Sequence, residues 1–161
     1  MTFRRWGAAG ISHDQSFIIF GGSAGSLLLS STEIITEQGG VSPGPEMPEA
    51  VRFHSIASVD ATTSIIIGGQ NGGNSYSPKT WFFYHASQPT QQFQPGPLLI
   101  TGRSNHASAT IQDHITMENI VAVVGGRSAI IPQYSPYPQL LDSTELLIDG
   151  EWQQGKNNVK L

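Results

Sequence analysis

Phe17-Ile18-Ile19-Phe20-Gly21-Gly22 is the first of three short apolar runs that end in a double glycine. The second is Ser64-Ile65-Ile66-Ile67-Gly68-Gly69, and the third is Val121-Ala122-Val123-Val124-Gly125-Gly126. A short run of β-branched, aromatic or small apolar residues that stops at glycine is typical of a buried strand followed by a turn. Because the pattern recurs three times, the sequence predicts a repeated strand unit.

Other features recur around each double glycine in the same order. A third strand is predicted at 31–35, 79–83 and 143–147, and a shorter fourth strand at 41–45, 93–97 and 152–155. The fourth strands begin at Val41, Phe93 and Trp152, which gives repeat spacings of 52 and then 59 residues. No window of ten or more residues shows the apolar period of a helix, so we expect helical content near zero.

Composition limits the class of protein. The chain has 161 residues and a mass of 17.3 kDa, enough for one domain with its own core. The net charge of −4 argues against a nucleic acid or an anionic membrane as partner. The absence of cysteine excludes disulfides, thiolate metal sites and cysteine nucleophiles. With no long apolar run and no signal-peptide pattern, we expect a cytoplasmic protein without a membrane segment.

The arrangement resembles the kelch repeat. That family has Arg or His before the first strand, a double glycine after the second, an acidic residue in the third and an aromatic residue in the fourth. The matching residues are Arg52, His54, Arg103 and His106, the glycines Gly21, Gly22, Gly68, Gly69, Gly125 and Gly126, the acids Glu33 and Glu145, and the aromatics Phe93 and Trp152. The departures are Gly7 in place of the first His, Val41 in place of Trp and Trp81 in place of Glu.

The resemblance, which covers about residues 4–155, implies an all-β fold with three four-stranded antiparallel blades of a kelch-type β-propeller. The repeats are expected at about 4–47, 50–98 and 101–155, in a single region 1–161. Propellers typically close with about four to eight blades. Three blades therefore predict an incomplete propeller: a fragment of a longer protein, a partner for a second copy that associates through open blade edges, or an open arc.

Three arginines are the first candidates for partner binding. Arg5, Arg52 and Arg103 are expected at equivalent points between successive blades. The resemblance implies that such connections line one mouth of the central channel, where arginine can bind acidic peptides bidentately. The alternative is that these arginines brace the blades by binding backbone carbonyls or the carboxylates of Glu33 and Glu145.

The remaining candidates divide into loop and scaffold residues. Tyr134 and Tyr137 lie in a proline-rich stretch, 130–138, that is either a recognition surface or a divergent insertion. His54 and His106 share one slot and are expected to be structural, because no third ligand accompanies them to form a metal site. The aromatic run 81–84 and Trp152 are expected to pack in the core.

The sequence shows no catalytic set. It has no nucleophile elbow, no phosphate-binding glycine loop and no paired acid and base, and His13, His85 and His114 form no motif. We therefore expect a non-enzymatic module that presents its loops to a protein partner and needs no cofactor or metal. The alternatives are a sugar-processing or oxidase-like kelch enzyme and an inert fragment. The copper radical oxidases of the family need a Cys-Tyr crosslink, which this chain cannot form.

Overall fold

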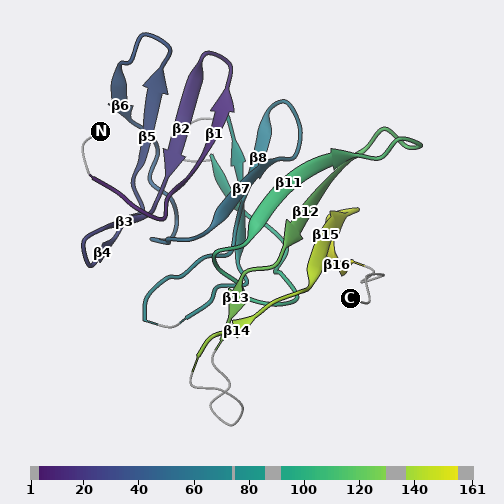
Figure 1. Cartoon of the computed structure of the whole chain (residues 1–161). Coiled ribbons are helices and arrows are strands. Elements are labelled where there is room, and N and C mark those ends of the chain that lie inside the picture. Colours follow the sequence, from purple (N-terminus) through teal and green to yellow (C-terminus); the bar gives the residue numbers. More distant parts are fainter. Residues whose placement is uncertain (1–3, 74, 86–91, 130–136, 156–161) are drawn as a thin grey trace.

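The computed structural model describes residues 4–73, 75–85, 92–129 and 137–155, and it consists of strands and loops (Figure 1). Sheet I contains, in spatial order, β1 (Ala9–His13), β2 (Ser16–Phe20), β5 (Thr32–Thr36) and β6 (Val41–Pro43). None of the described residues forms a helix of the length and apolar character that a membrane crossing requires.

Two further sheets repeat this design. Sheet II contains β7 (Ser55–Ser58), β8 (Thr63–Ile67), β9 (Thr80–Tyr84) and β10 (Phe93–Pro95). Sheet III contains β11 (Ala107–Gln112), β12 (Asn119–Val124), β15 (Thr144–Ile148) and β16 (Glu151–Gln154). Two short hairpins join β3 (Ser23–Ala24) to β4 (Leu27–Leu28), and β13 (Arg127–Ser128) to β14 (Gln139–Leu140). The prediction of an all-β protein with four-stranded antiparallel sheets is confirmed.

The strand registers of the three sheets are equivalent. Thr32 lies opposite Phe20 in sheet I, Thr80 opposite Ile67 in sheet II, and Thr144 opposite Val124 in sheet III. Counting from these pairs assigns every strand position to one of two faces, because successive side chains alternate across a strand. We call the face toward the next sheet in the chain the trailing face and the opposite one the leading face.

The core lies between the sheets. One buried cluster joins Ile18 and Phe20 on the trailing face of sheet I to Ile66 and Phe83 on the leading face of sheet II. A second cluster joins the trailing face of sheet II to the leading face of sheet III; its members are Ala57, Ile65, Ile67, Leu99, Val121, Val123, Leu147 and Trp152. Each sheet therefore needs a neighbour to bury its apolar side chains.

The double glycines lie where the connections between sheets approach most closely. Gly21 and Gly68 have φ of 55° and 60°, in a backbone region that residues other than glycine rarely adopt. A Cβ on Gly21 would lie 2.6 Å from the carbonyl oxygen of Val51, and one on Gly68 would lie 2.6 Å from that of Arg103. Glycine at these positions therefore lets the chain segment that enters the next sheet pack directly against the preceding one.

Candidate interaction surface

The hydrogen bonds of the connections show which residues are equivalent. The Gly22 N–H donates to the carbonyl of Val51, and the Gly69 N–H donates to that of Arg103. In the following position, Arg52 pairs with Gln70 and Ser104 pairs with Arg127 in isolated β-bridges. Val51, and not Arg52, is therefore the counterpart of Arg103. The expectation that the three arginines occupy equivalent points is wrong for Arg52, by one residue.

Arg103 is fully buried against sheet III. Its Nη2 donates to Oε1 of Glu145 at 2.6 Å, and its Nη1 donates to the carbonyls of Gly125 and Ser143 at 2.9 and 3.2 Å. The Glu145 carboxylate also accepts the backbone N–H groups of Ile100 and Thr101, at 2.7 and 3.0 Å. These contacts agree with the alternative in which the arginines brace the sheets. Arg103 connects the segment that enters sheet III to the strands of that sheet.

Arg5 makes the corresponding contacts in sheet I. Its guanidinium lies 3.3 Å from the Glu33 carboxylate and donates to the carbonyls of Gly21 and Ser31, both at 2.9 Å. The Arg5 and Glu33 side chains are both buried. Like Arg103, Arg5 thus offers no guanidinium donor to a partner at the surface.

Sheet II replaces the buried ion pair with apolar residues. Val51 occupies the arginine position and Trp81 the glutamate position, since Trp81 lies opposite Ile66 as Glu145 lies opposite Val123. Val51 is buried in the cluster between sheets I and II, and Trp81 packs against the same cluster. Pro48 is the counterpart of Ile100, which it precedes by the repeat spacing of 52 residues. In sheet III the Ile100 N–H donates to the Glu145 carboxylate. Proline has no N–H, so the loss of the carboxylate leaves no unpaired donor there.

Arg52 lies instead in a surface cluster with two aromatic rings. Its guanidinium carbon is 4.9 Å from the centroid of the Trp6 ring and 5.2 Å from that of the Phe53 ring. The two rings meet edge to face at 5.2 Å, and Arg52 Nε lies 3.3 Å from Oε1 of Gln70. Trp6 remains 47% exposed. We call Trp6, Arg52, Phe53 and Gln70 the Arg52 cluster.

The Arg52 cluster lies at the end of the sheets where the short hairpins project. Figure 1 shows the hairpins β3–β4 and β13–β14 below the four-stranded sheets. Trp6 forms a bridge with Ser23 of β3, and the equivalent Ser104 forms one with Arg127 of β13. Tyr137 is exposed two residues before β14, at the same end, whereas Tyr134 lies outside the described residues. The structure thus brings Arg52 and Tyr137 to one end of the molecule and separates both from Arg5 and Arg103, which are buried.

His54 and His106 lie between sheets. A Cβ on Gly21 would lie 3.1 Å from Cε1 of His54, and one on Gly68 would lie equally near Cε1 of His106. Burial lowers the pKa of His54 to about 3 and the pKa of His106 to about 4, with the neighbouring charges of His106 and Arg103 as the second causes. The two rings face the backbone of Phe20 and Ile67, yet no ring nitrogen reaches hydrogen-bond geometry within the described part of the chain.

The first repeat has Ala8, and not Gly7, in the histidine position. A Cβ on Gly22 would lie 3.0 Å from Cβ of Ala8, just as one on Gly126 would lie 2.9 Å from Cβ of His106. Gly7 corresponds to Phe53 and Asn105, which share its positive φ. Among the described residues, no group of three or more His, Asp or Glu side chains could hold a metal ion.

One polar contact was not expected from the sequence. The rings of His13 and His85 stack at 3.8 Å across sheets I and II, and Nε2 of His85 lies 2.9 Å from Oγ of Ser64. Burial and the charge of His13 lower the pKa of His85. Ser64 is fully buried, so its hydroxyl cannot reach a substrate. No sequence motif links these residues, because strand pairing within sheet II and the packing of sheet I on sheet II bring them together.

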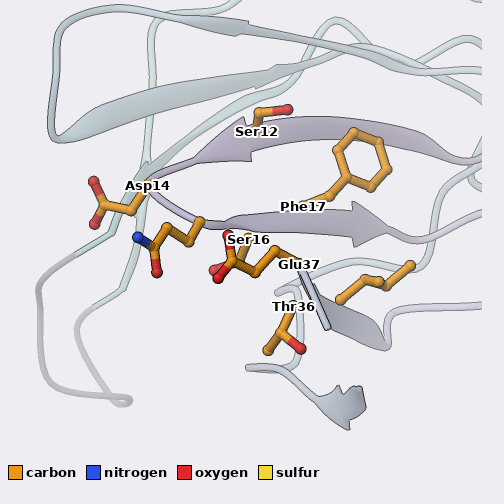
Figure 2. A pocket seen from close by; sticks show the side chains of 8 residues that line it. Ser12, Asp14, Ser16, Phe17, Thr36 and Glu37 are labelled. Carbon is orange, nitrogen blue, oxygen red and sulfur yellow. The ribbon is translucent and has the colours of Figure 1, made fainter. Parts of the chain in front are cut away.

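The open face of sheet I contains a shallow hollow of about 410 Å³. Its lining comes from β1, β2, β5 and the adjoining turns (Figure 2); the residues are Ser12, Asp14, Gln15, Ser16, Phe17, Ile35, Thr36 and Glu37.

Two of the aromatic residues expected in the core are buried. Phe83 is fully buried, and Trp152 is buried with its indole N–H donating to the carbonyl of Pro97 at 3.1 Å.

No protein-family model matches the chain, and no curated protein sequence matches it either.

Proposed function

We propose that this chain is a non-enzymatic protein-interaction module built on a kelch-type β-propeller scaffold that is incomplete in this chain. The partner contacts the end of the sheets that carries the Arg52 cluster and the two short hairpins. The observation that supports this most directly is the exposed Trp6 ring beside the Arg52 guanidinium. Tryptophan, arginine and tyrosine dominate the binding energy of known protein interfaces.

Acidic peptides are the class of ligand that this end favours. Arg4 is exposed two residues before Trp6, and the exposed Arg127 of β13 pairs with Ser104 of the next connection, so this end of the sheets carries three arginines although the net charge is −4. Aromatic contact orients the Arg52 guanidinium, which leaves its remaining N–H donors for a carboxylate. The buried Arg5 and Arg103 take no part in this binding and hold the connections in place.

Fluorescence polarisation with a labelled glutamate-rich peptide tests the proposal. Binding is expected to exceed that of the matching glutamine-rich peptide, and Arg52→Ala is expected to weaken it about tenfold, the effect of roughly 1.4 kcal/mol at an interface. Lys79→Ala is the matched control, because it removes the same charge from a surface residue that pairs with Glu49. An equal loss in both variants, or equal binding of both peptides, would contradict the proposal.

A further inference from the structure

Within the described residues, no sheet packs on the trailing face of sheet III. Phe20, Ile67 and Val124 occupy the same position in successive sheets, and their exposed fractions are 0%, 0% and 51%. Phe20 is covered by sheet II and Ile67 by sheet III. The apolar residues of the uncovered face are Ala107, Ala109, Ile111, Ile120, Ala122, Val124, Leu146 and Ile148. A continuous apolar sheet face of this kind is typical of an interaction surface.

The double glycine of sheet III also lacks its usual contact. Gly21 and Gly68 each lie against a backbone carbonyl and a histidine ring of the next connection. A Cβ on Gly125 would meet no described atom nearer than the Leu141 carbonyl oxygen, at 3.5 Å. Gly125 nevertheless has the same positive φ, 65°. Its backbone is therefore shaped for a connection that sheet III does not receive from the described part of the chain.

A row of backbone hydrogen bonds ends with complementary groups. The Phe53 N–H donates to the Gly7 carbonyl at 2.7 Å, and the Asn105 N–H donates to the Phe53 carbonyl at 2.9 Å. No hydrogen bond joins the Gly7 N–H or the Asn105 carbonyl to another described residue. One end of the row thus presents a donor and the other an acceptor, in the same local conformation.

The leading face of sheet I is open as well. Phe17, Ser64 and Val121 occupy the same position, yet Phe17 is 41% exposed whereas Ser64 and Val121 are buried by the preceding sheets. Beside Phe17 lie the hollow of Figure 2 and a second one of about 260 Å³, which Trp6, Gly7, Gly10 and Ile19 help to line. The described residues therefore leave one trailing face and one leading face open.

We propose that the trailing face of sheet III binds the leading face of sheet I from a second copy of this chain. The contact would continue the series already present between sheets I and II and between sheets II and III, with the Gly7 N–H of one copy donating to the Asn105 carbonyl of the other. Two copies joined reciprocally contain six sheets, within the range of about four to eight in which such sheets close into a ring, whereas three copies would exceed it.

Light scattering of the 161-residue chain during gel filtration, at concentrations from about 1 to 100 μM, tests the proposal. The expected result is a dimer of twice 17.3 kDa. Val124→Glu and Phe17→Glu each place a charge on one of the two open faces, so each variant alone is expected to be a monomer that retains its β-type circular dichroism. Ile115→Glu, in an exposed turn away from both faces, is the matched control and should remain dimeric.

Mixing the two variants establishes the direction of the contact. Phe17→Glu keeps an intact trailing face and Val124→Glu an intact leading face, so the mixture should restore a dimer through a single contact, with weaker association. A monomeric parent chain, or a Phe17→Glu variant that still dimerises alone, would overturn the proposal. A series of larger oligomers would overturn the closed pair. Phe17→Glu adds a charge to a hollow that Trp6 also lines, so peptide binding is measured with the Val124→Glu variant, which leaves the Arg52 cluster unchanged. Retained peptide binding by that monomer separates this proposal from the proposed function.

Discussion

Two arginines of successive connections have opposite environments. The Arg103 guanidinium is buried and donates to one carboxylate and two backbone carbonyls. The Arg52 guanidinium lies beside the Trp6 and Phe53 rings and remains in contact with solvent. A buried ion pair adds little net stability compared with apolar residues, but removal of one partner leaves the other charge buried and uncompensated. The cost of losing each arginine should therefore differ greatly.

Arg103→Ala is expected to lower the free energy of unfolding by about 3–5 kcal/mol, since it strands the Glu145 carboxylate in the interior. Arg52→Ala should lower it by no more than about 1 kcal/mol, the value of an exposed cation–π contact. Urea denaturation followed by circular dichroism measures both, in the Val124→Glu background so that association does not contribute. Equal losses would show that Arg103 is not the buried brace.

The two buried histidines predict a loss of stability in mild acid. Their pKa values of about 3 and about 4 lie below the ordinary 6.5, so the folded chain binds fewer protons than the unfolded chain. Their contribution is complete above about pH 6.5 and is lost as the pH falls toward 4, by about 1.4 kcal/mol per pH unit for each histidine. Melting temperatures should fall between pH 7 and 5. His106→Gln should roughly halve that fall, and an unchanged slope would contradict the assignment.

At the scale of the strand, sheet II shows that the connection can be fastened in two ways. Sheets I and III use an Arg–Glu pair, and sheet II uses Val51 and Trp81. The exchange extends to a third position, because Pro48 stands where sheet III has the Ile100 N–H that binds the glutamate. Val51 and Trp81 replace both charges together, and Pro48 removes one of the two backbone N–H groups that the glutamate accepts in sheet III.

Transfer of this set into sheet III tests the compensation. Arg103→Val alone should destabilise the chain about as much as Arg103→Ala, while the triple variant Arg103→Val, Glu145→Trp, Ile100→Pro should recover at least half of that loss. Urea unfolding of the single, double and triple variants gives the interaction free energy directly. Additive losses across the series would show that the three positions act independently.

The double glycines allow a matched comparison between sheets. Gly68 and Gly125 have φ of 60° and 65°, but only Gly68 has a backbone carbonyl in the path of a Cβ. In the monomeric Val124→Glu background, Gly125→Ala should cost about 1–2 kcal/mol for the left-handed backbone. Gly68→Ala should cost about 1–3 kcal/mol more for the overlap with the Arg103 carbonyl. Thermal unfolding measures the difference, and equal costs would mean that the connection does not press on Gly68.

At the largest scale, the described part of the chain forms three four-stranded sheets stacked in chain order, which bury two interfaces and leave two faces open. The described chain holds both halves of the missing contact, one at each end of the series. The Arg52 cluster lies at the ends of the strands, where its Trp6 also lines the hollow beside Phe17 on the leading face of sheet I.

The sequence alone determined the strand class, the four-strand repeat and the position of the double glycines. Those properties follow from local patterns, namely short apolar runs and the conformational freedom of glycine. The constant spacing of 52 residues from His54 to His106, shared by the Pro-Gly-Pro turns, would also have aligned Val51 with Arg103. Matching residues by type placed Arg52 there instead.

Only the tertiary structure decided which arginines are buried, which histidines lie between sheets and which faces stay open. Arg52 and Arg103 are the same residue type in similar surroundings along the chain, but a one-residue difference in register directs them to different sides of the connection. Val124 and Ile67 differ in exposure only because a sheet that begins about 40 residues later covers Ile67. Burial of this kind depends on partners far along the chain, so no local pattern contains it.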